Sequence, residues 1–209
     1  KSTLIKNFMD LLVIPNIENS YKRERARDEL PQSAAGRTIM TTEPKFIPEE
    51  SVEINLGGNT TFNVRMIDCV GYIVNSAIGY SEEDEPRMVK TPWSEEEIPF
   101  EQAAEIGTKK VIQEHSTIGI LVTTDGSVTG IEREDYIEPE ERVVRELKEL
   151  NKPFVIVLNS VEPDSEYTQT LAQKLQEKYD TQVIPTDCEN LTADKIDEIY
   201  TPLLNFKIS

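Results

Sequence analysis

Two residues at the start of the chain, Lys1 and Ser2, have the types that bind nucleotide phosphates and their metal ion. They open the stretch KSTLIKNFMDLL, in which apolar residues recur at helical spacing. A phosphate-binding loop reads G-x-x-x-x-G-K-[ST], so the pair matches its last two positions, and Thr3 follows. In such a loop the lysine reaches the β- and γ-phosphates and the hydroxyl binds Mg²⁺. The match alone is weak, because a Lys-Ser pair also begins many surface helices.

An aspartate and a glycine further along the chain form a second phosphate-related motif. Asp68 ends an apolar strand, and Gly71 completes the D-x-x-G of the stretch DCVG. In switch-type NTPases this aspartate holds Mg²⁺, usually through water, and the glycine N–H meets the γ-phosphate. D-x-x-G is also common where a strand simply runs into a turn. The place of Asp68, after a hairpin and before alternating helices and strands, favours the metal-binding interpretation.

Three threonines lie between these two motifs, in the stretch TIMTTEPKF. Thr38, Thr41 and Thr42 fall in a polar region after the first helix and before the hairpin. This is where a switch I threonine is found, whose hydroxyl joins Mg²⁺ and whose backbone N–H contacts the γ-phosphate. The three motifs are weak one by one, but their order along the chain predicts a nucleotide site.

The residues that would read the nucleotide base depart from the guanine-binding pattern N-K-x-D. After the strand of VIVLNSVEPDS, Asn159 is present, Ser160 replaces the lysine, and Glu162 replaces the aspartate. Loss of the lysine removes packing against the base, and glutamate is one methylene longer than aspartate. Asn159 and Ser160 remain candidate nucleotide contacts, but guanine selectivity is in doubt and adenine becomes a candidate base.

Tyr72 follows D-x-x-G, where many GTPases have a glutamine that orients the attacking water. Tyrosine is a poor general base near neutral pH, because its usual pKa is about 10. We therefore expect slow hydrolysis, with water positioned by the backbone, by a switch threonine or by a second subunit.

The hydrophobic pattern supplies the elements that must position these residues. Strands 118–122 and 154–158 are almost continuously apolar, which is typical of a parallel sheet covered by helices on both faces. The fold class predicted is α/β, a P-loop NTPase with a mostly parallel sheet, one antiparallel hairpin strand and helices on both faces. The other expected elements are a helix over 2–13 ended by Pro15, a polar stretch over 16–44, a hairpin of strands 51–56 and 60–67, an irregular insertion over 72–98, helices near 99–114, 138–151, 164–179 and 192–205, and a short strand in QVIPTD.

Charge and cysteine content limit the partners of the chain. The 209 residues include 39 acidic and 22 basic side chains, for a net charge of −17. Such a surface repels nucleic-acid phosphates and anionic lipids, so we expect no nucleic-acid partner and no direct membrane binding. No apolar run approaches the ~20 residues of a membrane-spanning helix. The two cysteines, Cys69 and Cys188, lie far apart in sequence, which indicates a reducing cytoplasm rather than a disulfide framework.

Several long stretches resemble the stage IV sporulation protein A family of spore-forming Firmicutes. They include DELPQSAAGRTIMTTEPKF, IPFEQAAEIGTKKVI and EHSTIGILVTTDGS, and the resemblance covers nearly all of the chain. It implies a cytoskeleton-like ATPase whose N-terminal domain is related to the translation-factor class of GTPases yet hydrolyses ATP. The family polymerises around the developing forespore, on the mother-cell side, and forms the basement layer of the spore coat.

The resemblance also implies roles for individual residues. Lys1 and Ser2 would end the Walker A motif, Asp68 would be the Walker B acid, and Thr41 and Thr42 would be the sensor threonines. The predicted catalytic residues are then Lys1, Thr41, Thr42 and Asp68. The predicted magnesium ligands are Ser2, Thr41 and Asp68, with ATP and Mg²⁺ as cofactors. Nucleotide contacts are expected from Lys1, Ser2, Thr3, Gly71, Asn159 and Ser160.

The resemblance further predicts domain organisation and partners. Residues 1–209 would form one P-loop NTPase domain that begins inside the Walker A loop, without the middle and C-terminal domains of the family. Expected partners are further copies of the same protein, other spore coat proteins, and a small amphipathic membrane peptide that the absent C-terminal region contacts. Two alternatives stay open, a non-hydrolysing scaffold with a relic nucleotide site and a regulatory GTPase.

Overall fold

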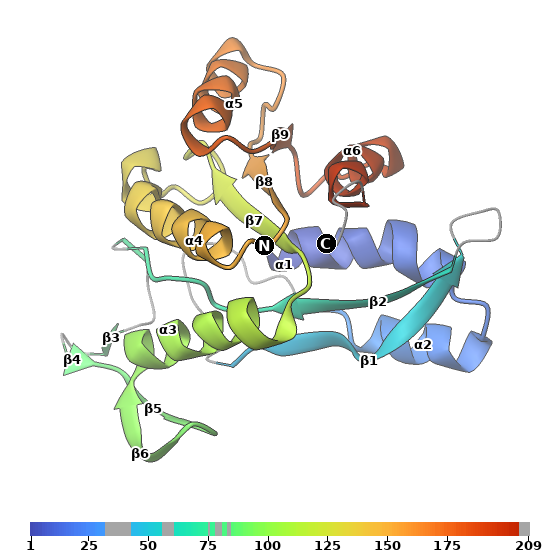
Figure 1. The fold of residues 1–209 in the computed structure, drawn as a ribbon, viewed down its shortest axis with the longest axis horizontal. Coiled ribbons are helices and arrows are strands. Elements are labelled where there is room, and N and C mark those ends of the chain that lie inside the picture. Colours follow the sequence, from blue (N-terminus) through green and yellow to red (C-terminus); the bar gives the residue numbers. More distant parts are fainter. Residues whose placement is uncertain (32–42, 56–60, 75, 78–80, 83–84, 205–209) are drawn as a thin grey trace.

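A computed structural model describes residues 1–31, 43–55, 61–74, 76–77, 81–82 and 85–204, and Figure 1 shows its fold. Helices and strands alternate along the second half of the chain, after an N-terminal helix and a long hairpin. Within the described residues no helix combines the length and the apolar character needed to cross a bilayer. The helices are α1 Ser2–Phe8, α2 Ser20–Asp28, α3 Phe100–Lys110, α4 Ile137–Glu149, α5 Glu166–Tyr179 and α6 Ala193–Leu204. The strands are β1 Lys45–Asn55, β2 Thr61–Asp68, β3 Ser81–Glu82, β4 Glu85–Pro86, β5 Met88–Thr91, β6 Ser94–Pro99, β7 Gly119–Thr124, β8 Phe154–Asn159 and β9 Val183–Thr186.

The three strands β7, β8 and β9 form a parallel sheet in that order, with β8 in the centre. Successive side chains of a strand point to opposite faces, so the apolar run of β8 buries residues on both sides. Val155 and Val157 pack with α1 and α6, whereas Ile156 and Leu158 pack with α4 and α5. Figure 1 shows α4 on one side of this sheet and α1 and α6 on the other. The predicted parallel sheet with helices on both faces is confirmed.

The hairpin β1–β2 is antiparallel, as expected, but it does not extend the parallel sheet. Among the described residues its two strands pair only with each other, and the hydrophobic core on the α1 and α6 side of the sheet joins them to it. Leu4 and Phe8 of α1 contact that core together with Val52 of β1 and Val155 of β8. Helix α1 therefore lies between hairpin and sheet, where it positions the end of β2 relative to the parallel strands (Figure 1).

Two segments differ from the sequence-based expectation. The polar stretch over 16–44 contains α2, whose start is capped by the Asn19 side chain accepting the Lys22 N–H at 3.0 Å. Only Ala26 of this helix is buried, so no apolar periodicity marked it. The insertion over 72–98 was expected to be irregular, but it contains the antiparallel hairpin β5–β6. The glutamate run of β6 has low strand propensity, so the pairing with β5 overrides the local preference.

The first helix also continues beyond its expected end. After α1 the chain forms a π-helical turn at Met9–Val13 and a 3₁₀ turn at Ile14–Asn16. Pro15 lies inside the last turn instead of stopping the helix before it. Proline is tolerated there because the first residues of a helical turn need no N–H donor.

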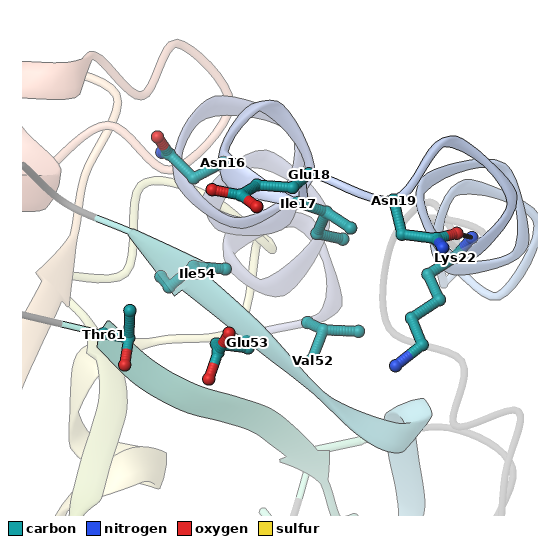
Figure 2. Close-up of a pocket in the computed structure, with 9 residues that line it drawn as sticks. All are labelled: Asn16, Ile17, Glu18, Asn19, Lys22, Val52, Glu53, Ile54 and Thr61. Carbon is teal, nitrogen blue, oxygen red and sulfur yellow. Dashed lines mark hydrogen bonds between the residues drawn. The ribbon is translucent and has the colours of Figure 1, made fainter.

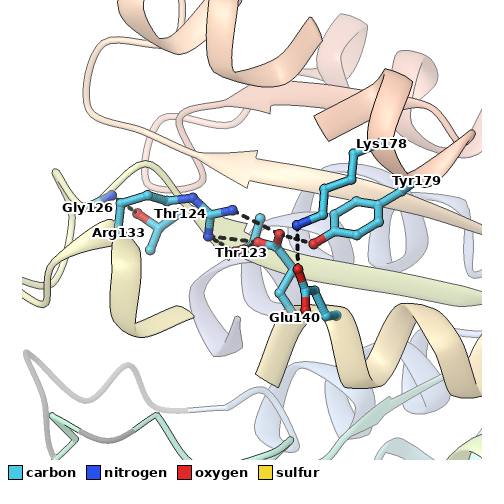
Figure 3. A network of polar contacts seen from close by, with 8 residues as sticks. Thr123, Thr124, Gly126, Arg133, Glu140, Lys178 and Tyr179 are labelled. Atoms are coloured by element: carbon cyan, nitrogen blue, oxygen red, sulfur yellow. Dashed lines mark hydrogen bonds and ion pairs between the residues drawn. The ribbon is translucent and has the colours of Figure 1, made fainter. Parts of the chain in front are cut away.

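A buried polar network fixes the loop after β7 against α4 and α5 (Figure 3). Arg133 contacts Glu140 through both ends of its guanidinium group, with N–O distances of 2.8 Å each. Glu140 also accepts hydrogen bonds from Thr123 of β7 at 2.6 Å and from Tyr179 of α5 at 2.7 Å. The two buried charges therefore pair with each other, and both Glu140 oxygens also accept hydrogen bonds from neutral hydroxyls, as low-dielectric surroundings require.

Candidate functional site

The structure brings Lys1, Ser2 and Asp68 together although Asp68 lies far along the chain. The Lys1 ammonium is 2.6 Å from Asp68 Oδ1 and also donates to the Cys69 carbonyl. The Ser2 hydroxyl donates to Asp68 Oδ2 at 2.8 Å. An ammonium, a hydroxyl and a carboxylate therefore meet at one point, where the two motifs predicted that they would lie.

Local structure explains why these groups meet. Asp68 is the last residue of β2 and is only 5% exposed, whereas Ser2 is the first residue of α1. The unpaired N–H groups and the dipole of a helix N-terminus favour anions nearby. The positive end of α1 and the Lys1 ammonium together stabilise the Asp68 carboxylate, and the same features suit a phosphate group.

The groups around Asp68 fit a magnesium ion bound together with a nucleotide. Asp68 Oδ1 meets Lys1 only as an ion pair, without hydrogen-bond geometry, and Oδ2 accepts the Ser2 hydroxyl. Mg²⁺ prefers oxygen ligands and takes one or two carboxylates with water and substrate phosphates. Within the described part of the chain, no group of three or more His, Cys, Asp or Glu residues could hold a metal. One carboxylate and one hydroxyl, from Asp68 and Ser2, are an oxygen set that suits Mg²⁺ arriving with phosphates.

Of the other residues predicted to contact phosphate or Mg²⁺ through the three motifs, the structure describes Thr3 and Gly71. Thr3 lies in the first turn of α1 and is half-buried. Gly71 has φ +81°, a left-handed conformation that side-chain-bearing residues rarely adopt, so the turn itself requires glycine at this position. Thr38, Thr41 and Thr42 lie outside the described residues, so their roles stay predictions.

Tyr72, the residue after Gly71, is buried against α4. Its hydroxyl donates a hydrogen bond to Glu146, and the guanidinium carbon of Arg142 lies 3.8 Å from the ring centre. Arg142 also forms an ion pair with Glu105 of α3. The phenol hydroxyl is thus used in a hydrogen bond within the protein, in agreement with the expectation that it does not act as a base.

We expect Tyr72→Phe to lower the free energy of unfolding by about 1–2 kcal/mol, because the hydrogen bond to Glu146 is lost while the ring packing stays. Burial, and then the hydrogen bond to Glu146, raise the pKa of Tyr72 above its usual 10. The folded state thus holds the phenol proton more tightly than the unfolded chain does. The resulting contribution to the free energy of unfolding is fully present below pH 10 and is lost as the pH rises above 10. Urea titrations below and above pH 10 check both effects.

The same variant also tests whether the phenol takes part in chemistry. Phosphate release by Tyr72→Phe near neutral pH should stay within about twofold of the native rate, since an interaction outside the chemistry alters stability and not turnover. A loss of about 100-fold or more would place the hydroxyl in the reaction.

Asn159 and Ser160 lie at the carboxyl end of β8, but they face different surroundings. The Asn159 side-chain oxygen accepts the Cys188 N–H at 3.0 Å, and the Ser160 hydroxyl is buried 3.2 Å from that of Thr168. Ser160 therefore points into the protein, and its backbone is what could meet a base. None of the hydrogen bonds or ion pairs found in the described residues joins these two residues directly to Asp68.

An indirect connection runs from α1 to the base-binding candidates. The Asn7 side chain in α1 donates to the Cys188 carbonyl at 2.7 Å, and the Cys188 N–H donates to Asn159. The helix that begins at Ser2 is thus hydrogen-bonded to the loop after β9, which holds Asn159 in place. Parallel strands end at one edge of a sheet, and this edge is where open α/β folds bind ligands.

A separate cavity of about 180 Å³ lies between the end of the first helix, α2 and the hairpin (Figure 2). Asn16, Lys22, Val52 and Thr61 are among its lining residues. Thr61 begins β2 and Asp68 ends it, so the two are about 23 Å apart at ~3.3 Å per residue. None of the predicted site residues lines this cavity, and the Lys1–Asp68 cluster is the better candidate.

Comparison with known proteins finds a family model and several relatives that match nearly the whole chain. The family model described as "Stage IV sporulation protein A, ATPase domain" matches residues 1–206. Proteins named stage IV sporulation protein A are 55% identical over 204 residues in Clostridioides difficile (strain 630), 60% over 191 in Bacillus anthracis and 54% over 209 in Bacillus subtilis (strain 168). These matches cover 98%, 91% and 100% of this chain, but only 42%, 39% and 42% of the relatives. The chain thus spans about two fifths of their length. No solved structure matches it.

Proposed function

The chain belongs to the family of the ATPase domain of stage IV sporulation protein A, and from this premise we propose that it binds Mg-ATP at Lys1, Ser2 and Asp68 and hydrolyses it. The observation that carries the proposal is the meeting of the Lys1 ammonium, the Ser2 hydroxyl and the buried Asp68 carboxylate within 2.8 Å. Lys1 would bind phosphate oxygens, while Ser2 and Asp68 would face the metal. Bound Mg²⁺ supplies charge neutralisation and orients the triphosphate.

The proposal extends to the type of domain. The antiparallel hairpin that ends in Asp68-x-x-Gly71, followed by parallel strands, supports a P-loop NTPase related to the translation-factor class of GTPases. Thr41 and Thr42 would then be the sensor threonines. Movement of the segments next to Thr42 and Asp68 between nucleotide states is a common switch in such enzymes.

At the level of the whole protein, the nucleotide cycle would drive self-association into the basement layer of the spore coat, on the mother-cell side of the forespore. Other coat proteins would bind the resulting polymer. A small amphipathic membrane peptide would bind a C-terminal region outside the chain described here. The names of the relatives support a role in sporulation, and the name of the family supports an ATPase.

Competition between ATP and GTP for the full-length protein tests the choice of base. We expect ATP to bind more tightly than GTP, because the matching family is that of an ATPase domain and this chain lacks the guanine-specific partners that would favour GTP by about tenfold or more. Both the lysine and the aspartate of the guanine pattern are replaced, by Ser160 and Glu162. Tighter binding of GTP would support a regulatory GTPase instead.

One observation favours a second candidate, a scaffold that binds nucleotide without hydrolysing it. The side chain that follows D-x-x-G, Tyr72, is bonded to Glu146 and cannot orient water from that position. Mg-ATP binding by the full-length protein with no phosphate release would establish the scaffold. Release that depends on Asp68 would exclude it.

A further inference from the structure

Asp125, which follows β7, is a buried carboxylate that the proposed mechanism does not use. It is 8% exposed, and no ion pair involves it in the part of the chain that the structure describes. Oδ1 accepts the Ser127 N–H at 3.0 Å and the Ser127 hydroxyl at 2.5 Å, and Oδ2 accepts the Thr168 hydroxyl at 2.8 Å. Burial by itself raises the pKa of Asp125, but hydrogen bonds from Ser127, Ser160 and Thr168 outweigh burial and lower it. The group is therefore a hydrogen-bonded anion at neutral pH.

Asp125 and the residues hydrogen-bonded to it also contact the turn at 159–162. The Asp125 N–H donates to the Asn159 carbonyl at 3.3 Å, and the Ser127 hydroxyl accepts the Val161 N–H at 3.1 Å. Thr168, in the first turn of α5, lies 3.2 Å from the Ser160 hydroxyl. Asp125 and its partners thus contact three successive residues of this turn.

Other bonds leave the turn little freedom. The Ser160 hydroxyl accepts the Glu162 N–H at 3.0 Å, and the Ser160 N–H donates to the Thr186 carbonyl of β9 at 3.0 Å. The Asn159 side chain is held by Cys188. Because the Ser160 side chain points inward, its contribution to a base contact can come only from its backbone. The exposed Val161 and Glu162 side chains also start from this backbone, so its position sets what the turn can recognise.

We propose that Asp125 is a positioning residue for nucleobase selectivity, which it controls by fixing the 159–162 turn through Ser127 and Thr168. The inference rests on the proposed function, since it assigns that turn to the base of the nucleotide. Asp125 itself does not touch the base. Its two oxygens hold two hydroxyl groups in fixed orientations, and these hydroxyls define where the turn lies.

Two matched substitutions of buried threonines separate this role from a general effect on stability. Thr168→Val removes the hydroxyl that donates a hydrogen bond to Asp125, and it keeps the size and shape of the side chain. Thr123→Val makes the same change two residues before Asp125, where the hydroxyl bonds to Glu140 in the network of Figure 3. Thr168→Ser restores the hydroxyl and serves as the conservative variant.

The experiment measures dissociation constants of Mg-ATP and Mg-GTP for the full-length protein by calorimetry, with urea titrations of each variant. We expect Thr168→Val to lower the ratio of ATP to GTP affinity by about tenfold, a typical size for one lost specificity contact. Thr168→Ser should restore the ratio, and Thr123→Val should leave it unchanged despite a comparable loss of stability. If the native protein binds nucleotide and the affinity ratio is the same in all variants, the inference is overturned but the proposed function is not. Equal changes of the ratio in Thr168→Val and Thr123→Val have the same meaning. Failure of the native protein to bind either nucleotide overturns the proposed function and the inference with it.

Discussion

Asp68→Asn should lower ATP turnover of the full-length protein by about 10²–10³-fold, the size seen when one charge-stabilising group is removed from an active site. Asparagine keeps the shape of the side chain and can still accept the Ser2 hydroxyl. It removes the negative charge that pairs with Lys1 at 2.6 Å and that would face Mg²⁺. Phosphate release at saturating Mg-ATP is the measurement.

Asp10→Asn is the matched control for that experiment. Asp10 is an exposed aspartate in the continuation of the first helix, so the same change there should leave turnover within about twofold. Equal rates for the native protein and Asp68→Asn would refute the proposed role of Asp68 in hydrolysis. Full activity would mean that Asp68 holds Lys1 and Ser2 in place without taking part in chemistry.

The largest expected effect on stability comes from the buried pair Arg133–Glu140. Arg133→Ala should lower the free energy of unfolding by about 3–5 kcal/mol, because it leaves the Glu140 carboxylate buried without its cation. Glu140 is 3% exposed, and its remaining partners, Thr123 and Tyr179, are neutral donors. Urea titration followed by circular dichroism gives the loss directly.

Two comparisons show whether burial is the cause of that loss. Lys178→Ala breaks an ion pair with Glu141 in which both side chains are about half exposed, so it should cost at most about 1 kcal/mol. Replacing both partners, Arg133→Met with Glu140→Leu, should recover part of the stability, because it removes the unpaired buried charge but leaves the Thr123 and Tyr179 hydroxyls without their acceptor. An Arg133→Ala loss no larger than that of Lys178→Ala would contradict this account.

The parallel sheet could be predicted from sequence because its strands carry their own signal. β8 is apolar at nearly every position, which only burial on both faces explains. Asp68 ends β2, whose apolar side chains alternate with polar ones. The meeting of Lys1, Ser2 and Asp68 was predicted from motif order alone. Motif order was sufficient here because the lysine and hydroxyl of a phosphate-binding loop and the aspartate of D-x-x-G serve the same nucleotide and metal ion.

Other features left no such signal. α2 is charged on almost all sides, and the pairing of β6 with β5 depends on a partner strand rather than on its own residues. Trp93, between these strands, packs close to Gly107 of α3, a contact between residues that no periodicity connects. Tertiary contacts decide such elements, so local propensity fails there.

The role of Asp125 illustrates the same limit within the site. Its sequence neighbourhood, DGS, is typical of a loop, and an aspartate there has many ordinary explanations. Its importance follows from the Thr168 hydroxyl, which lies 43 residues away in sequence and 2.8 Å away in space. An Asx-type contact with Ser127 could be guessed from sequence, whereas the contact with α5 could not.

A crystal structure of the full-length protein with Mg²⁺ and a non-hydrolysable ATP analogue tests the central claim most directly. The account predicts that the Lys1 ammonium contacts phosphate oxygens, that Ser2 and Asp68 lie on the metal side, and that the adenine lies beside the 159–162 turn. A nucleotide bound elsewhere, for example in the cavity lined by Asn16 and Thr61, with the Lys1–Asp68 ion pair unchanged, would contradict it.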